Sequence, residues 1–310
     1  MQLDDIPEIK VQKISDKFLD EHQVQLDILR LDQIHPHISG NKWFKLKYNL
    51  LEARKKGYDT LLTFGGAFSN HLYATAAAGK EDSFKTIGVV RGEKVLPLNT
   101  TLAFAEAQDM QLEFISRSDY QHKGEATFQK ELQKKFGDCF IIPEGGSNAL
   151  AVKGCTEIVQ TPENYDYICC SAGTGGTLAG IIEKAKNKAQ VLGFSALKGG
   201  SFLYDEINRL TQAYSGNQYE NYQIVEDYHF GGYAKANTEL VNFINEFKRE
   251  QEILLDPIYT GKMIYGIMDM INKGYFKLGS KILAIHSGGL QGIIGFNERY
   301  LKKNLRILVS

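Results

Sequence analysis

Short apolar runs rich in β-branched residues alternate with amphipathic helical patterns along almost the whole chain. Turns that contain glycine separate many of these segments. A strand, a helix and a second strand in succession are typical of a parallel βαβ unit, because the helix carries the chain back to the starting edge of the sheet. The alternation therefore predicts an α/β fold built on parallel sheets.

The expected strands span residues 25–31, 60–64, 86–90, 112–116, 139–142, 165–170, 191–196, 222–227 and 281–285. The expected helices span residues 45–56, 70–78, 99–108, 125–136, 178–188, 203–211, 239–248 and 261–273. Glycines at 57 and 79 are expected to end the first two of these helices.

A chain of 310 residues with 43% hydrophobic composition can bury one large core or two modest ones, and we expect two lobes. No internal repeat, low-complexity segment or Pro/Ser-rich linker separates them, and there are only 6 prolines. The boundaries are therefore expected where elements pack, near residues 46 and 155. This gives a large lobe from 1–45 and 156–310, and a smaller α/β lobe from 46–155.

The charge balance favours a small-molecule partner. A formal net charge of -1 argues against binding to nucleic acid or an anionic membrane through the overall field of the protein. Acidic residues interrupt the apolar ones over 1–10, which is wrong for a signal peptide, and no apolar run approaches membrane-spanning length. We expect a cytoplasmic protein with no nucleic-acid or membrane partner.

Neither the histidines nor the cysteines are spaced as a metal site. His35 and His37 flank Pro36 without further ligands nearby, and we interpret them as structural. The four cysteines lack C-x-x-C spacing and a histidine placed to complete a zinc site. They are predicted to be reduced, mostly buried thiols: Cys139, Cys155, Cys169 and Cys170.

A short run around Lys42 places an amine where it can become a nucleophile. Gly40 precedes this lysine, and the bulky Trp43 and Phe44 follow it. Burial against aromatic rings disfavours the ammonium form, and Lys45 would share a helical face and lower the pKa of Lys42 further. A lysine tuned in this way forms Schiff bases with carbonyl compounds. The alternative is a solvated surface charge, which is the usual situation of a lysine.

A glycine-rich turn over residues 171–177 gives the clearest signal for an anion. It lies between an expected strand and an expected helix, where several backbone N–H groups can converge beside a helix N-terminus. It lacks the Gly-Lys-Ser/Thr ending of a P-loop and the full G-x-G-x-x-G spacing. The alternative is a tight turn that merely connects two elements. Open α/β sheets bind ligands at the carboxyl ends of strands, which is where this turn lies.

Four further turns follow expected strands or precede expected helices, at 64–71, 143–148, 255–262 and 286–289. In the first of them, Ser69 or Asn70 could serve simply as a helix N-cap. Together with Lys42, the five turns supply an amine for an aldehyde, a cradle for a phosphate and polar groups for a ring. A pyridoxal phosphate enzyme needs these parts.

In this combination and order the chain resembles the 1-aminocyclopropane-1-carboxylate deaminase and D-cysteine desulfhydrase family, from about residue 25 to about residue 295. The resemblance implies the tryptophan synthase β-like fold of fold type II enzymes, with two open, twisted parallel-sheet lobes. It also implies pyridoxal 5'-phosphate in the cleft, a large cofactor-binding lobe and a homodimer. The motifs that carry it are Gly40-Asn41-Lys42 with Lys45, Gly65-Gly66 with Ser69-Asn70, 144–148, 172–177, 256–262 and 286–289.

The resemblance also implies roles for individual residues. Lys42 would hold the cofactor covalently and, once freed, act as general base. Asn70 would hydrogen-bond the ring hydroxyl, and Ser69 would face the substrate carboxylate and amine. Tyr233 and Tyr259 match active-site tyrosines, although packing is the alternative in a chain with 16 tyrosines. The phosphate would be bound by Lys45 and the backbone of Gly173, Thr174, Gly175, Gly176 and Thr177.

The implied reaction removes a proton from the substrate carbon, expels a β-substituent or opens a ring, and yields a 2-oxo acid and ammonia. The resemblance also implies a difference between the two branches of the family. The deaminases that open the cyclopropane ring carry a glutamate where this chain has Thr260 and a leucine where it has Ser287. A carboxylate beside the pyridine nitrogen favours the protonated, strongly electron-withdrawing ring. The two hydroxyls at the cofactor therefore predict β-elimination from a small D-amino acid such as D-cysteine, with weak or absent ring opening.

Ala234 and Lys235 after Tyr233 also depart from the smaller residues typical of the family, so the substrate entrance is expected to differ.

Three alternatives stay open. The first is 1-aminocyclopropane-1-carboxylate deamination to 2-oxobutanoate. The second is another reaction on the same fold, such as L-serine or L-threonine dehydration or cysteine synthesis, which the run 66–70 fits poorly. The third is a non-catalytic protein that binds a phosphate ligand or the cofactor, for which loss of the lysine, the serine or the tyrosines would be expected.

Overall fold

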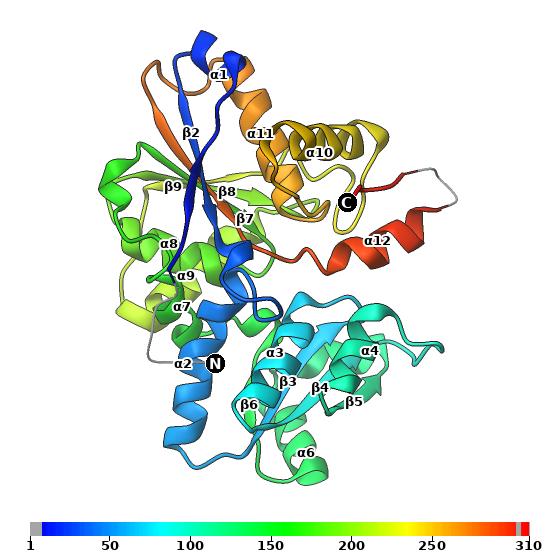
Figure 1. The fold of residues 1–310 in the computed structure, drawn as a ribbon. Helices are drawn as coiled ribbons and strands as arrows, with labels where there is room; N and C mark the ends of the chain where they lie inside the picture. The colour runs from blue at the N-terminus through cyan, green and yellow to red at the C-terminus, as the bar shows by residue number, and fades with distance from the viewer. Residues whose placement is uncertain (1–7, 302–304, 310) are drawn as a thin grey trace.

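The computed structural model describes residues 8–301 and 305–309. The prediction that the chain does not begin with a signal peptide rests on residues 1–10, and residues 1–7 of these lie outside the described range. The described chain forms a six-stranded sheet in the order β1-β2-β10-β7-β8-β9 and a four-stranded sheet in the order β5-β4-β3-β6, with helices packed around both (Figure 1). The predicted α/β fold with two parallel-sheet regions is confirmed.

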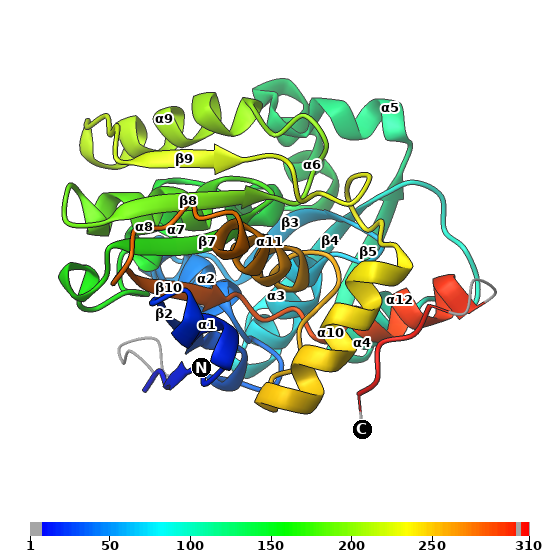
Figure 2. The same cartoon turned by 90° about the horizontal axis from the view of Figure 1, so that it is seen from above.

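The six-stranded sheet combines both ends of the sequence. Its last strand, β10, lies between β2 and β7, so that Ile285 pairs with Leu29 on one side and Cys170 on the other. Among the described strands of this sheet, only β1 runs antiparallel to its neighbour, and Figure 2 shows the remaining strands side by side. The strands are Val11–Lys13 (β1), Gln25–Arg30 (β2), Tyr167–Ala172 (β7), Gln190–Ser195 (β8), Tyr222–Val225 (β9) and Lys281–His286 (β10).

The four-stranded sheet is parallel throughout. Its chain moves outward from β3 to β4 and β5, and then returns to place β6 on the other side of β3. Ligands of open α/β sheets bind at the carboxyl ends of the strands where the order reverses. Here those ends carry the turns 64–71 and 143–148. The strands are Thr60–Gly66 (β3), Lys85–Arg91 (β4), Met110–Ile115 (β5) and Phe140–Ile142 (β6).

The helices that matter most for the site begin at the carboxyl ends of strands or next to them. The α-helices are Lys17–Glu21 (α1), Asn41–Lys55 (α2), Asn70–Glu81 (α3), Thr100–Ala107 (α4), Arg117–Tyr120 (α5), Ala126–Phe136 (α6), Ala149–Cys155 (α7), Gly176–Ala185 (α8), Phe202–Ser215 (α9), Thr238–Gln251 (α10), Thr260–Asn272 (α11) and Gly292–Tyr300 (α12). None of the described helices is long and apolar enough to cross a membrane.

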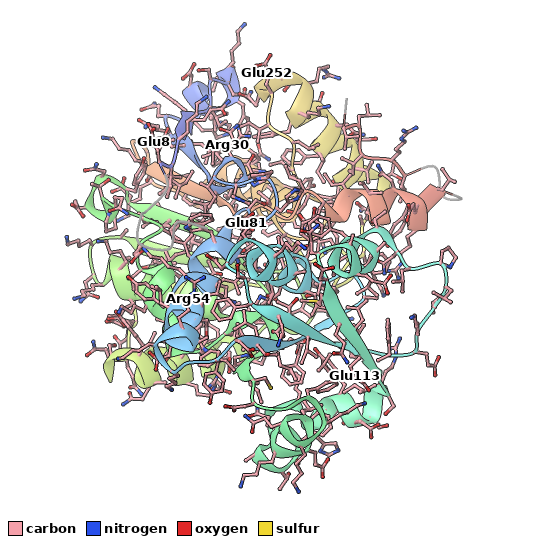
Figure 3. The ribbon with its side chains drawn as sticks, turned by 60° about the horizontal axis from the view of Figure 1, so that its bottom comes forward. Glu8, Arg30, Arg54, Glu81, Glu113 and Glu252 are labelled. Carbon is pink, nitrogen blue, oxygen red and sulfur yellow. The ribbon has the colours of Figure 1, made fainter. Side chains whose placement is uncertain are left out.

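Helix α2 connects the two sheet regions. At its start, the Asn41 N–H donates to the Ser287 carbonyl at 3.2 Å, next to β10. Near its end, Arg54 (labelled in Figure 3) donates to the Asp82 carbonyl at 2.6 Å and lies over the Phe84 ring, both beside the smaller sheet. The predicted lobe boundary at residue 46 falls inside this continuous helix. The division into 1–45 with 156–310 and 46–155 stays a prediction.

Several helices extend beyond their predicted limits, α2 and α3 among them. The helix expected from residue 45 begins at Asn41, so Lys42 lies in its first turn. The helix expected to stop at Gly79 continues to Glu81. A Cβ at Gly79 would lie 2.2 Å from Thr86 Cγ2, so this glycine allows α3 to approach β4 instead of ending the helix.

Two helices of the site region were not predicted. Helix α7 contains Gly154, where a Cβ would lie 1.9 Å from the Phe44 carbonyl oxygen of α2. Helix α12 follows the last predicted strand. Glycine lowers helix propensity, but at Gly154 it permits the close packing of α7 against α2.

The four cysteines are free thiols in buried positions, as predicted. Burial raises the pKa of the Cys155 thiol to about 11 and that of the Cys170 thiol to about 12, and it also raises the pKa of Cys139 and of Cys169. Within the described residues, no group of three or more His, Cys, Asp or Glu side chains is arranged to hold a metal ion.

Candidate active site

Lys42 lies in the first turn of α2, where Gly40 makes the sharp entry into the helix with φ of 69°. Its side chain is half-buried, and Nζ donates to Asn41 Oδ1 at 2.9 Å. Burial, and secondly the nearby charge of Lys45, lower the pKa of Lys42 to about 7. A large fraction of this amine is therefore unprotonated at neutral pH, which is the state that attacks a carbonyl carbon.

Lys45 is buried, with 2% of its surface exposed, and points at the turn that precedes α8. Its Nζ donates to Ser147 Oγ at 2.9 Å and to Thr174 Oγ1 at 3.4 Å. Burial lowers the pKa of Lys45 to about 8, so it remains mostly cationic at pH 7. Because both hydrogen-bond partners are hydroxyls, the charge of Lys45 remains available to a bound anion.

Gly176 opens the space between these groups at the first residue of α8. A Cβ there would lie 2.8 Å from Ser147 Oγ and 3.1 Å from Lys45 Nζ. Gly175, with φ of 71°, is the N-cap of this helix. Thr177 accepts from Asn41 Nδ2 at 2.7 Å, so Asn41 links the turn to Lys42. A lysine, a helix N-terminus and a side-chain-free backbone thus converge on one point, which is the arrangement expected of an anion cradle.

Ser69 is the N-cap of α3, as the capping alternative predicted. Its hydroxyl accepts from the N–H groups of His71 and Leu72, both at 3.2 Å. In the described structure this hydroxyl makes no hydrogen bond to another predicted site residue. Asn70 Oδ1 accepts from Gln291 Nε2 at 2.9 Å, and a Cβ on Gly289 would lie 2.5 Å from Asn70 Nδ2. The start of α3 therefore meets the turn after β10.

Tyr259 and Tyr233 form a pair. Their hydroxyl oxygens are 3.5 Å apart, and their rings meet edge to face with centroids 6.0 Å apart. A Cβ on Gly173 would lie 3.3 Å from the Tyr259 hydroxyl, so this tyrosine borders the glycine-rich turn. Burial raises the pKa of both phenols, Tyr259 most strongly, so both are protonated at neutral pH. The pair can donate hydrogen bonds at this edge of the site.

Thr260 and Ser287 present hydroxyls from two different elements. Thr260 is fully buried, and its Oγ1 has no hydrogen-bond partner in the part of the chain that the structure describes. Ser287 Oγ lies 3.3 Å from Ser171 Oγ. The nearby Asp256 carboxylate is occupied by its own turn, where it accepts from the N–H groups of Ile258, Tyr259 and Thr260 at 2.8 to 2.9 Å. A buried hydroxyl without a partner is costly unless a ligand supplies one.

Several residues that shape the site were not among the predicted site residues. Most of their partners lie far away in sequence, so the local patterns gave no sign of those contacts, whereas the partners of His71 and Asp256 lie within 8 residues. All of them except Gln291 lie inside turns or motifs that the sequence singled out. The residues are Asn41, His71, Ser147, Ser171, Asp256, Lys262 and Gln291.

Residues 10–288 match the family model described as "Pyridoxal-phosphate dependent enzyme". The chain is 31% identical over 275 residues to "Putative 1-aminocyclopropane-1-carboxylate deaminase" of Pyrococcus horikoshii, a match that covers 85% of this chain and 84% of that protein. It is 30% identical over 293 residues to "Bifunctional D-cysteine desulfhydrase/1-aminocyclopropane-1-carboxylate deaminase, mitochondrial" of Arabidopsis thaliana, covering 87% of this chain and 73% of that protein.

Among solved structures, one described as that of "the ACC deaminase homologue" has a TM-score of 0.82 and 28% sequence identity, and the match covers 97% of both chains. A hydrogen sulfide-producing enzyme from Fusobacterium nucleatum has a TM-score of 0.66 at 17% identity, with 93% of this chain and 98% of that chain covered, and shares the fold.

The residues at the site fit pyridoxal phosphate. Lys42 is an amine with a lowered pKa, the cradle at Gly176 has room that a Cβ would fill, and the buried Thr260 hydroxyl lacks a partner. These features match what the cofactor requires: an amine for its aldehyde, a site for its phosphate and polar groups for its ring. The chain belongs to the pyridoxal-phosphate dependent enzyme family and, within it, to the relatives of 1-aminocyclopropane-1-carboxylate deaminase and D-cysteine desulfhydrase.

Proposed function

We propose that this enzyme is a deaminating lyase that carries out β-elimination on D-cysteine or a similar small D-amino acid. Sulfide leaves, and water hydrolyses the remaining aminoacrylate-type product to a 2-oxo acid and ammonia. The observation that carries the proposal is the pair Thr260 and Ser287, which offers hydroxyls where a ring-opening enzyme is expected to place a carboxylate. The only carboxylate in that turn, Asp256, is held by three backbone N–H groups. A less cationic ring suffices to expel a good leaving group such as sulfide.

When bound, pyridoxal phosphate supplies an electron-withdrawing ring that stabilises negative charge on the substrate carbon. In the proposed mechanism Lys45 and the cradle at Gly176 bind the phosphate, and Asn70 orients the ring hydroxyl. Lys42 removes the proton from the substrate carbon, for which a pKa of about 7 suits it at neutral pH. The remaining cradle positions are assigned to Gly173, Thr174, Gly175 and Thr177.

The substrate is proposed to lie between Ser69 and the tyrosine pair. Ser69 sits at the N-terminus of α3, where backbone N–H groups and the helix dipole favour a carboxylate. Tyr259 and Tyr233 are protonated phenols 3.5 Å apart, and either can give a proton to the departing sulfur. In this proposal the base, Lys42, and the candidate acids are therefore different residues.

The pKa of Lys42 predicts how cofactor uptake depends on pH. The fraction of neutral amine rises as pH rises through about 7, so the rate at which apoenzyme takes up pyridoxal phosphate should rise over the same range and then level off. An unperturbed lysine would keep gaining reactivity up to about pH 10. Stopped-flow absorbance on apoenzyme between about pH 6 and 9.5 measures this. A rate that climbs steadily to the top of the range would contradict the low pKa.

Ring opening of 1-aminocyclopropane-1-carboxylate is the second candidate, because both named relatives carry that activity in their names. The test is to record the visible spectrum of the purified protein and then assay sulfide and 2-oxo acid with D-cysteine, L-cysteine and 1-aminocyclopropane-1-carboxylate separately. We expect a yellow protein that releases sulfide from D-cysteine alone. Comparable 2-oxo acid from the cyclopropane substrate would overturn the choice based on Thr260. A colourless protein that cannot be reconstituted would favour the non-catalytic alternative.

We also propose that the enzyme is a cytoplasmic homodimer. The resemblance supports the dimer, and so do several large apolar side chains that remain exposed on the single chain, among them Val95, Leu96 and Leu301 at 71 to 72% exposure. Sedimentation of the sample used for the assays would show a species of twice the chain mass, whereas a single chain in solution would exclude the dimer.

A further inference from the structure

The loop that carries Tyr233 has an unusual backbone. Phe230, Gly231, Gly232 and Ala234 all have positive φ, at 51°, 89°, 117° and 53°. Two of these four residues, Phe230 and Ala234, carry side chains, and residues with a Cβ rarely adopt this conformation. A loop of this kind keeps its shape only when other groups hold it.

Lys262 is one of the groups that hold it, beside the Tyr300 hydroxyl, which donates to the Ala234 carbonyl at 3.1 Å. The Lys262 side chain enters from the first turn of α11, with 2% of its surface exposed. Its Nζ donates to the carbonyls of His229 and Gly232, each at 2.8 Å. The two carbonyls enclose Phe230 and Gly231, and the second of them, that of Gly232, directly precedes Tyr233. The ammonium group therefore joins the two ends of the turn.

The placement of Lys262 is costly for the fold. A cation in the first turn of a helix opposes the helix dipole, and burial penalises its charge. Burial lowers the pKa of Lys262 to about 8, against the opposing effect of the Asp256 carboxylate. That carboxylate is occupied by backbone N–H groups and makes no ion pair with Lys262 among the described residues. Plain packing would be better served by an apolar side chain of similar length.

The same short segment of chain also presents the other tyrosine. Tyr259 precedes Lys262 by three residues, and its hydroxyl is 3.5 Å from that of Tyr233. Tyr233 itself is 43% exposed, so packing alone does not fix its side chain. We infer that Lys262 is a positioning residue that fixes the Tyr233 hydroxyl against Tyr259 by holding the His229 and Gly232 carbonyls. The inference rests on the proposed role of Tyr233 in catalysis.

A double-mutant cycle on the holoenzyme tests it, with wild type, Tyr233→Phe, Lys262→Met and the double variant. Lys262→Met is expected to lower kcat/KM with D-cysteine by about 10- to 100-fold, through kcat more than KM. In the Tyr233→Phe background the same change should cost less than about twofold, because the hydroxyl it positions is already gone. If the kcat/KM loss of the double variant equals the product of the two single losses, Lys262 does not act through Tyr233. That result would overturn the positioning role of Lys262 and leave the role of Tyr233 intact. Full activity of Tyr233→Phe would instead remove the role of Tyr233, and the inference with it.

Hydrogen exchange on the apoenzyme gives a second readout that does not depend on activity. Lys262→Met should speed amide exchange in residues 229–235 by about tenfold or more and leave the start of α8 unchanged. Lys273→Met is the matched control, since it removes an exposed lysine from the end of the same helix. Unchanged exchange over 229–235 would overturn the inference. If Lys262→Met does not fold, Lys262→Gln takes its place, because it keeps a shorter donor.

Discussion

Lys42→Ala is expected to abolish the visible absorption of the bound cofactor and to lower turnover by at least about a thousandfold. The variant loses both the covalent attachment and the proposed general base. It should still fold, since alanine is favourable in a helix and the lost side chain is a half-buried amine with a depressed pKa. The cradle around Lys45 remains, so non-covalent binding of the phosphate should persist.

Spectra and sulfide assays of the two proteins measure this effect, and equilibrium dialysis measures the residual affinity for the cofactor. Lys55→Ala is the control, because it removes an exposed lysine from the last turn of the same helix and should leave the spectrum and activity unchanged. Activity of Lys42→Ala within about tenfold of wild type would show that another amine does the work.

Gly40→Ala is expected to be the most destabilising of the single-methyl changes around the site. The new Cβ would lie 1.9 Å from the Ser287 carbonyl oxygen and 2.8 Å from Gly288 Cα, and the residue would keep φ of 69°. Backbone lines both sides of this contact, so neither can move aside cheaply. We expect a loss of about 3 kcal/mol or more in the free energy of unfolding, together with weaker cofactor binding as Lys42 moves away from the turn after β10.

The other end of the same helix provides the matched control. Gly57 also has positive φ, at 78°, but a Cβ there would have no neighbour within 4 Å. Gly57→Ala should therefore cost about 1 kcal/mol, from the backbone conformation alone. Denaturant unfolding of both apoenzymes compares the two variants. Equal losses would mean that conformation, and not crowding against Ser287, decides the stability at Gly40.

The sequence predicted the fold well because its signals are local. Strand runs, helical spacing and glycine turns are properties of neighbouring residues, and the five turns were found from them. The failures occur where a residue serves a distant contact. Gly79 was expected to end a helix, but it allows α3 to pack closely on Thr86, and Gly154 lies inside a helix that was not predicted, where it allows close packing on Phe44. Local patterns could not distinguish these two uses of glycine.

The sequence pointed to parts of the candidate site that are adjacent in the chain and missed the contacts that connect them. Lys42 stood out because of its own neighbours, whereas the link from Asn41 to Thr177 spans 136 residues and that from Asn70 to Gln291 spans 221. Lys262 was predicted only as part of a turn. Its hydrogen bonds to the His229 and Gly232 carbonyls depend on the tertiary fold. The roles assigned to the predicted residues stay proposals until they are tested.

The rate at which the buried thiols react can report local unfolding of the protein. With a pKa of about 11, roughly one Cys155 thiol in ten thousand is ionised at pH 7, so reagents that need the thiolate react slowly while the fold is closed. Cys139 directly precedes β6 in the smaller sheet, and Cys169 and Cys170 lie on β7 in the larger one. The order in which a thiol reagent labels them would therefore show which half of the molecule opens first, without any engineered probe.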